Sequence, residues 1–325
     1  MITFVHLVLF LASAAVIWFF AGMLVESINR VAQRFYLSGF TVAFFVLGFL
    51  TSISEISVMV NSTIDKAPQI SAGNVIGASF VILLCIVPLL AIAGNGIRLT
   101  NTLRKSSLAL ALVVVLLPVL LVLDGNVTRS EGAVCLLLYG LLIYRIRRQA
   151  SVTVPTVVKA VETNLLHKRR VTIVDAGKII VGAAFIFIAG NLLVDESLYF
   201  SNILSIPSSI VGLLVLSIGT NIPEMVIAAR SLLKKHTDIA FGDYLGSTVA
   251  NTVIFSFLPW LSGNFTIEHT EFLFTAVLMA VGFVGFYIAA QSKNTISRAE
   301  GVALIALYVL FVIVQSITFI KFATD

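Results

Sequence analysis

The stretch Gly219-Thr220-Asn221-Ile222-Pro223-Glu224 places polar and helix-breaking residues inside an apolar run at about residues 203–229. A related stretch, Thr51-Ser52-Ile53-Ser54-Glu55, lies inside an earlier apolar run. At an offset of 169 in the numbering, 42–82 aligns with 211–251 without a gap, and 11 of the 41 aligned positions are identical. Because the matched positions include Thr, Glu and two Gly rather than apolar residues alone, they indicate an internal duplication.

The composition around these stretches is that of a membrane protein. Of 325 residues, 59% are apolar and 11% are charged, and the charges fall into short clusters between apolar runs long enough to cross a bilayer. Soluble proteins of this length carry charge over most of their surface. The runs predict ten transmembrane helices, at about residues 3–25, 37–61, 70–97, 106–124, 131–147, 172–194, 203–229, 240–262, 268–291 and 298–320.

The distribution of Lys and Arg predicts the orientation of these helices. Threading the chain through ten helices puts 18 of its 21 basic residues on one side of the membrane. By the positive-inside rule that side is cytoplasmic, so both the N-terminus and the C-terminus are predicted to be extracytoplasmic. Each half holds five helices, an odd number, so the second copy enters the membrane from the opposite side. This is an inverted repeat, an arrangement that places a binding site near the midplane.

The predicted fold class is therefore an all-α polytopic membrane protein with ten transmembrane helices in two inverted five-helix repeats. Residues 1–147 form the first half, with its repeat unit at 37–97, and residues 172–325 form the second half, with its repeat unit at 203–262. A basic cytoplasmic linker at 148–171 joins them, and membrane topology explains its charges better than a lipid-regulated switch does. The first apolar run reads as a retained helix rather than a signal peptide, and the predicted location is a prokaryotic inner (plasma) membrane.

Glu55 and Glu224 lie at membrane depth, where a bare carboxylate costs several kcal/mol. No Lys or Arg lies inside the neighbouring apolar runs, so a proton or a metal cation is expected to neutralise them. Two carboxylates with hydroxyls, an amide and freed backbone carbonyls form a hard, all-oxygen site suited to Ca²⁺ or Na⁺. Pro223 and Gly219 loosen the helix, so carbonyls near 217–220 can turn toward the ion.

The helix after each glutamate motif carries glycines that allow close helix packing. These are Gly73, Gly77, Gly242 and Gly246. Ser247 and Asn251 are four positions apart, so they share one helix face, which is predicted to line the site. Cys85 and Cys135 lie in apolar runs outside the motifs, and this disfavours a soft metal.

The stretch at 219–224 and the later Gly246-Ser247 pair resemble the alpha-repeat signatures of the Ca²⁺:cation antiporter superfamily, which contains the sodium/calcium exchangers. The resemblance covers nearly the whole chain, and the second copy is the more specific match. It implies that the Glu of each repeat chelates Ca²⁺ and that neighbouring hydroxyl and amide side chains complete the ion sites. The implied ligand set is Thr51, Ser52, Glu55, Thr220, Asn221, Glu224, Ser247 and Asn251.

The first copy departs from the family pattern. The replacements are Leu50 for Gly, Ser54 for Pro, Ala78 for Ser, and Ile82 for the polar residue expected opposite Asn251. The first half has therefore lost oxygen ligands, and Asn251 is neutral where many sodium/calcium exchangers carry Asp. Asp243 would restore a charge, but a solvated carboxylate at the start of the eighth helix is the favoured interpretation.

The expected function is a secondary antiporter that exchanges Ca²⁺ for Na⁺ by alternating access, with no catalytic residues and no cofactor. Coupling to H⁺ is the alternative, because the lost ligands leave fewer places for Na⁺. A non-transporting ion sensor and a membrane-embedded enzyme are weaker hypotheses, since no nucleophile-base pair lies at membrane depth. The expected partners are inorganic cations and the lipid bilayer, without nucleic acid, and a monomer is the working state. The four histidines are expected to be solvated or interfacial.

Overall fold

The computed structural model of the chain describes residues 2–32, 44, 48–98, 105–161, 173–204, 207–221, 224–225, 237–267, 272–291 and 295–324. These residues are almost entirely helical. The helices are α1 (Ile2–Ala32), α3 (Gly48–Thr51), α4 (Ile53–Ile64), α5 (Pro68–Val81), η3 (Ile82–Ile86), α6 (Val87–Ala93), α7 (Lys105–Leu121), η4 (Val122–Asp124), α8 (Arg129–Val161), α9 (Ile173–Ile203), α10 (Ser208–Val211), η6 (Gly212–Leu216), α11 (Ser217–Thr220), α13 (Thr237–Ser262), α14 (Phe272–Gln291) and α15 (Arg298–Thr324). Short antiparallel pairs join β1 (Ile97–Arg98) to β4 (Thr295–Ile296) and β2 (Asn126–Val127) to β3 (Phe265–Thr266).

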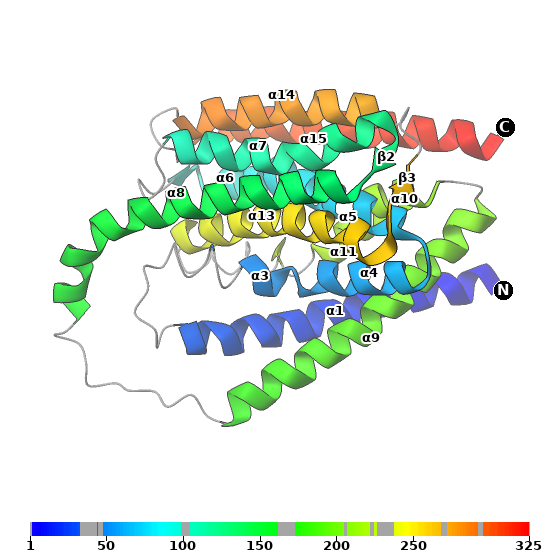
Figure 1. Cartoon of the computed structure of the whole chain (residues 1–325), viewed down its shortest axis with the longest axis horizontal. Coiled ribbons are helices and arrows are strands. Elements are labelled where there is room, and N and C mark those ends of the chain that lie inside the picture. Colours follow the sequence, from blue (N-terminus) through cyan, green and yellow to red (C-terminus); the bar gives the residue numbers. More distant parts are fainter. Residues whose placement is uncertain are drawn as a thin grey trace.

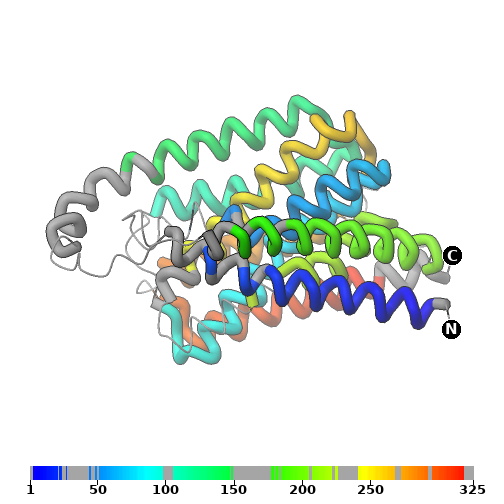
Figure 2. The backbone as a smooth tube through the Cα atoms, turned by 90° about the horizontal axis from the view of Figure 1, so that it is seen from below, coloured from blue at the N-terminus to red at the C-terminus, as the bar shows by residue number. Residues whose placement is uncertain are grey.

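The long helices form a bundle whose members run along one common direction (Figure 1). α1 begins and α15 ends at the same end of this bundle, where β2 and β3 also lie (Figure 1). α1 and α9 contact each other extensively and run side by side at the bottom of Figure 1, and Figure 2 shows this pair from below. α5, η3 and α6 form one continuous and mostly buried helix through the bundle. Helices that carry both repeat motifs therefore pack around a common centre.

The surface of the bundle is apolar and part of its interior is polar. Phe4, Leu137 and Ile180 expose 68%, 73% and 70% of their surface, whereas Glu55 and Glu224 expose 1% each. This reverses the pattern of a soluble protein and fits lipid surroundings. Among the described helices, six are long and apolar enough to cross a membrane: Thr3–Phe20, Pro68–Ala93, Lys105–Asp124, Ile180–Ile203, Phe272–Gln291 and Arg298–Ile317. The prediction of a polytopic α-helical membrane protein is thereby confirmed.

Several helices extend past the ends that the apolar runs predict. α8 continues beyond residue 147 to Val161, so the segment predicted as a basic linker at 148–171 begins as helix. α1 and α9 likewise continue past residues 25 and 194, to Ala32 and Ile203. Arg, Lys, Gln and Ala favour helix without requiring an apolar environment, so a helix can leave the hydrocarbon region without ending. Hydropathy therefore did not predict where these helices end.

Interior hydroxyl groups commonly donate to the carbonyl oxygen four positions earlier in the same helix. Ser52 Oγ donates to Gly48 O at 2.8 Å, and Ser197 Oγ and Ser217 Oγ donate to Leu193 O and Leu213 O at 2.6 Å each. This pattern satisfies the hydroxyl proton without a partner from another helix. A polar side chain can therefore lie inside an apolar bundle at low cost.

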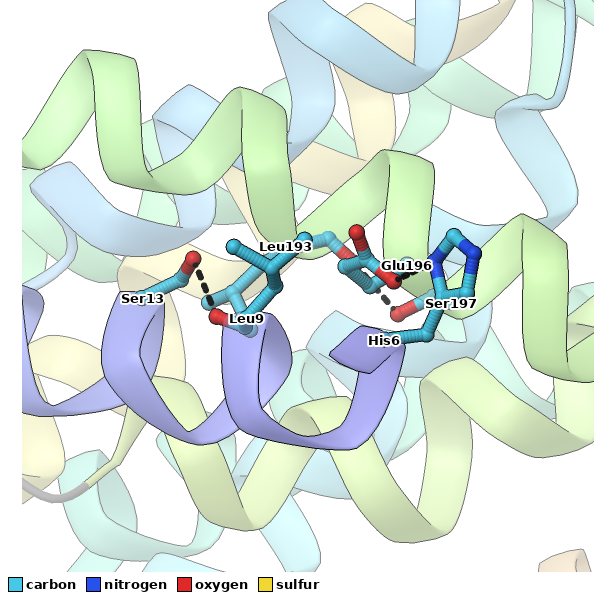
Figure 3. Close-up of polar contacts among 6 residues, drawn as sticks. All are labelled: His6, Leu9, Ser13, Leu193, Glu196 and Ser197. Atoms are coloured by element: carbon cyan, nitrogen blue, oxygen red, sulfur yellow. Dashed lines mark hydrogen bonds and ion pairs between the residues drawn. The ribbon is translucent and has the colours of Figure 1, made fainter. Parts of the chain in front are cut away.

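His6 on α1 forms a hydrogen bond with a carboxylate on α9 (Figure 3). Its Nδ1 lies 2.7 Å from Glu196 Oε2, and its ring stacks on Tyr199 with centroids 3.5 Å apart. The Glu196 side chain is 7% exposed and that of His6 is 29% exposed. His6 lies near the start of α1 and is partly exposed, in keeping with the expected interfacial position. Its contact with Glu196 was not predicted, because it depends on the continuation of α9 past residue 194.

His6→Leu is expected to lower the free energy of unfolding by about 1–3 kcal/mol, because the buried Glu196 carboxylate would lose its hydrogen-bond partner. Ser13→Ala is the matched control on the same helix, since the Ser13 hydroxyl donates only to its own helix, to Leu9 O at 2.8 Å (Figure 3). Thermal unfolding in detergent at neutral pH measures both. Equal melting temperatures for the two variants would contradict the stabilising role of the pair.

Candidate cation-binding site

The helices that carry the two motifs both break at the same motif position. α3 ends at Thr51 and Ser52 has φ −76° and ψ 10°, while α11 ends at Thr220 and Asn221 has φ −89° and ψ 7°. Ser52 and Asn221 are related by the repeat offset of 169. A ψ this close to zero departs from α-helical geometry and redirects the preceding carbonyls. Pro223 lies outside the described residues, and the first copy breaks without any proline, so proline is not required for the bend.

Glu55 lies just after the first break and is buried. Ser54 Oγ donates to Glu55 Oε2 at 2.8 Å and lies 3.3 Å from Thr220 O on α11. Ser54, which the sequence suggested was a lost motif residue, thus connects the first glutamate to the second copy. A carboxylate can accept about four hydrogen bonds. Neutral hydroxyl donors fill only part of that capacity and carry no positive charge, so the negative charge of the buried Glu55 carboxylate is largely uncompensated.

Among the described residues, no group forms a hydrogen bond of normal geometry with either carboxylate oxygen of Glu224, which is 1% exposed, and the Thr51 side chain acts on it only as a neutral donor. The carboxylates of Glu55 and Asp243 act on it by electrostatic repulsion. Tyr244 hydroxyl donates only to the Glu224 backbone carbonyl, at 3.4 Å. Burying such a group is strongly unfavourable unless a cation or proton compensates it. The arrangement is therefore suited to a positively charged ligand.

Thr51 is the centre of an oxygen cluster where α3 crosses α13. Its Oγ1 lies 2.6 Å from Ser247 Oγ, donates to Asp243 Oδ1 at 3.4 Å and lies 3.2 Å from Gly48 O. Ser247 Oγ lies 3.3 Å from the same Gly48 carbonyl. Asp243 is fully buried and its Oδ2 has no partner. The interpretation of Asp243 as a solvated helix-start carboxylate was wrong, because α13 begins at Thr237 and the first copy covers this turn.

The second copy contains a neutral counterpart of this cluster. Thr220 Oγ1 donates to Asn74 Oδ1 at 3.2 Å. Thr51 and Thr220 are related by the offset of 169, and so are Asn74 and Asp243. The same contact therefore recurs between copies, with an amide in one place and a carboxylate in the other.

The remaining predicted ligands are buried but lie at the edge of this arrangement. Asn221 Nδ2 donates to Ser217 O at 2.6 Å, and its Oδ1 has no partner. Asn251 Nδ2 lies 3.4 Å from Ser79 Oγ on α5, and its Oδ1 is also without a partner. Ser52 Oγ bonds to its own helix. All eight predicted side chains are thus buried around the two helix breaks, while their binding of an ion stays a prediction.

Two glycines allow the helices that carry the motifs to touch backbone to backbone. A Cβ on Gly246 of α13 would overlap the carbonyl oxygen of Phe44, and a Cβ on Gly77 of α5 would overlap the carbonyl oxygen of Leu213. Phe44 and Leu213 are also related by the offset of 169, and both lie in π-helical backbone. These close approaches hold each broken helix against the following helix of the other copy.

The donor set favours a hard cation over a transition metal. In the described ranges, no three His, Cys, Asp or Glu side chains come close enough to hold one ion among them. Cys85 and Cys135 are free thiols, as expected, and Cys135 lies in the hydrophobic core. Ligation would therefore combine the carboxylates with hydroxyl, amide and carbonyl oxygens, which are the ligands of Ca²⁺ and Na⁺ rather than of a soft metal.

Sequence reasoning left out Ser54, Asn74, Ser79 and Asp243 from the candidate ligands. Asn74 and Asp243 had a usable signal, because they are polar, aligned at the offset of 169 and set in otherwise apolar helices. Ser54 and Ser79 had none, because their importance depends on contacts with residues far along the chain.

Comparison with known proteins agrees with this chemistry. The family described as "Sodium/calcium exchanger protein" matches residues 5–146 and 175–317. The chain is 32% identical over 144 residues to the sodium/calcium exchanger MaX1 of Methanosarcina acetivorans, covering 43% of this chain and 40% of that protein. It is 26% identical over 251 residues to the inner membrane protein YrbG of Escherichia coli, covering 74% and 75% of the two chains. An uncharacterized membrane protein of Methanocaldococcus jannaschii is 25% identical over 90% of each chain.

The fold also matches a solved structure. The sodium-calcium exchanger NCX_Mj, soaked with Na⁺ and Sr²⁺, superposes with a TM-score of 0.68 over 95% of this chain and 98% of that chain, at 20% identity. A sequence identity of 20% supports a shared fold and nothing more specific.

Proposed function

Because the chain belongs to the sodium/calcium exchanger family, we propose that it is a secondary antiporter that exchanges Ca²⁺ for Na⁺ by alternating access. Its relatives are transporters and not enzymes. It is a multi-pass membrane protein for which inorganic cations are the substrates. The proposed working unit is one chain.

The observation that carries this proposal is the pair of buried carboxylates at the two helix breaks. Within the described part of the chain, the groups that act on the two carboxylates as donors are neutral hydroxyls, from Thr51 on Glu224 and from Ser54 on Glu55. Among the described residues, no Lys or Arg forms an ion pair with either group. A divalent cation between them would neutralise both charges, and Ca²⁺ accepts the irregular oxygen geometry that the eight predicted ligands offer.

Alternating access requires two matched gates, and the recurring contacts support an inverted repeat of ten helices. The contacts of Thr51 with Asp243 and of Thr220 with Asn74 are related by the offset of 169, and the family matches the chain in two separate segments. In the proposed topology both termini are extracytoplasmic and the basic segment at 148–171 is cytoplasmic.

Na⁺ is the proposed coupling ion because hydroxyl oxygens stand beside both carboxylates. Thr51, Ser247 and Thr220 are buried there and can replace water around a small monovalent cation. H⁺ is the alternative, favoured by the replacement of two oxygen ligands by Ala78 and Ile82, both of which are buried and apolar.

The test is ⁴⁵Ca²⁺ uptake into liposomes that contain the purified protein, with outward gradients of Na⁺, K⁺ and H⁺ imposed in turn. An outward Na⁺ gradient is expected to drive uptake, and an ionophore that dissipates it is expected to stop uptake. Uptake driven by the pH gradient alone would replace Na⁺ by H⁺ as the coupling ion. Absence of Ca²⁺ flux under every gradient would refute the antiporter and leave an ion sensor.

A further inference from the structure

We propose that Asp243 is a third charged ligand of the site and that it binds a monovalent cation, of the size and hardness of Na⁺, together with Thr51, Ser247 and the Gly48 carbonyl. The inference rests on the proposed antiport function and adds to it a residue that the family signature does not supply. It concerns the crossing of α3 and α13, beside the two glutamates.

The oxygens at this crossing converge and are linked by hydrogen bonds, which a bound cation would replace. Thr51 Oγ1 lies 2.6 Å from Ser247 Oγ, 3.2 Å from Gly48 O and 3.4 Å from Asp243 Oδ1. Ser247 Oγ lies 3.3 Å from Gly48 O. Each group supplies an oxygen, and the carboxyl group of Asp243 supplies a full negative charge when it is ionised. This is a suitable donor set for one hard monovalent cation.

The negative charge of Asp243 has no structural task that a neutral side chain could not perform. Its hydrogen bond with Thr51 is matched in the other copy by that of Thr220 with Asn74, which is an amide. Asp243 is fully buried, and its second oxygen has no hydrogen-bond partner. A buried carboxylate costs far more than an amide of the same shape. The charge is therefore explained by a ligand and not by the contact with Thr51.

The first copy lacks the groups that would form a second subsite of this kind. At the position equivalent to Ser247 the first copy has Ala78, which has no side-chain oxygen, and at the position equivalent to Asp243 it has Asn74. The counterpart of the crossing lacks both the hydroxyl and the charge. The monovalent cation is thus held on one side of the pseudo-symmetric site.

The number of carboxylates at the site relates this subsite to the exchange of Ca²⁺ for monovalent cations. Glu55 and Glu224 together balance one Ca²⁺, and Asp243 adds one negative charge near them. When the site holds monovalent cations, the three carboxylates can therefore balance one cation more than the two glutamates alone could balance. When this subsite holds no cation, the Thr51 hydroxyl donates to Asp243 and partly compensates its charge.

Ion-dependent thermal stability of the purified protein tests this inference without transport. NaCl is titrated against choline chloride at constant ionic strength, and CaCl₂ is titrated separately. Asp243→Asn is expected to raise the Na⁺ concentration for half-maximal stabilisation at least about 10-fold, and to shift that for Ca²⁺ by less than about 3-fold. Asp243→Glu, which keeps the charge, is expected to retain the Na⁺ response. Asp195→Asn on α9 is the control for removal of a carboxylate elsewhere.

The outcomes separate this inference from the function on which it rests. An unchanged Na⁺ response in Asp243→Asn overturns the inference and leaves the antiporter intact. Loss of both ion responses in Asp243→Asn, with no recovery in Asp243→Glu, also overturns it, because the residue would then be structural. A wild-type protein that transports no Ca²⁺ under any gradient refutes the antiporter itself. A selective loss of the Na⁺ response, restored by Asp243→Glu, supports the inference.

Discussion

Glu224→Gln is expected to reduce Ca²⁺ affinity and Ca²⁺ transport by roughly 100-fold or more, on the scale of about 2–5 kcal/mol for the loss of one partner of a buried charge pair. Gln keeps the size of the side chain and removes its charge. Among the described residues, neither oxygen of Glu224 has a hydrogen bond of normal geometry, so the substitution alters at most the interaction with the Thr51 side chain in the ion-free protein. The loss would therefore come from the ion and not from the fold.

The ion-free protein provides the second readout for this variant. When a chelator keeps the protein free of ions, Glu224→Gln is expected to melt at the same temperature as the wild type or higher, because it removes a carboxylate that Glu55 and Asp243 repel. Glu55→Gln is expected to impair transport as well, but it also alters the hydrogen bond from Ser54. Asp195→Asn removes an exposed carboxylate and serves as the control. Uptake by Glu224→Gln within about 3-fold of wild type would show that this carboxylate is not an ion ligand.

Gly246→Ala is expected to destabilise the protein by about 3 kcal/mol or more, at or beyond the upper end of ordinary overpacking. The added methyl group would overlap the carbonyl oxygen of Phe44, and backbone cannot turn away as a side chain can. Gly77→Ala should behave in the same way against the carbonyl oxygen of Leu213. Thermal unfolding and size-exclusion chromatography in detergent measure both variants.

Gly140→Ala on α8 is the matched control for these two substitutions. Nothing lies within 4 Å of a Cβ at this position. Alanine favours helix by up to about 1 kcal/mol over glycine, so this variant should be unchanged or slightly more stable. If all three variants melted alike, close backbone contact between the helices that carry the motifs would not be what holds the site together.

Apolar run lengths and one repeated motif were sufficient to predict a polytopic helical protein with a buried polar centre. Helix ends were harder to predict, because the continuation of α8 to Val161 depends on helix propensity outside the apolar run. The break at Ser52 was predicted less well than that at Asn221, since the first copy lacks the Gly and Pro that mark the second. The bend is therefore a property of the packed helices and not only of local sequence.

Asp243 shows most clearly that local sequence does not predict the surroundings of a side chain. Its position near a helix start suggested contact with water, whereas its burial depends on Thr51, which is 192 residues away in the sequence. Tertiary packing decides whether such a carboxylate is hydrated. The alignment of Asp243 with Asn74 at the repeat offset was the available clue, because a residue inherited by both copies occupies equivalent surroundings in each.

The hydroxyl groups that donate to their own helices give the interior a preference for one sign of charge. Ser52 and Ser217, which lie beside the helix breaks, direct their protons to backbone carbonyls, so only lone pairs of these oxygens remain for an ion. An anion at these positions would find no hydrogen-bond donor. The helical scaffold thereby adds to the preference of the carboxylates for cations.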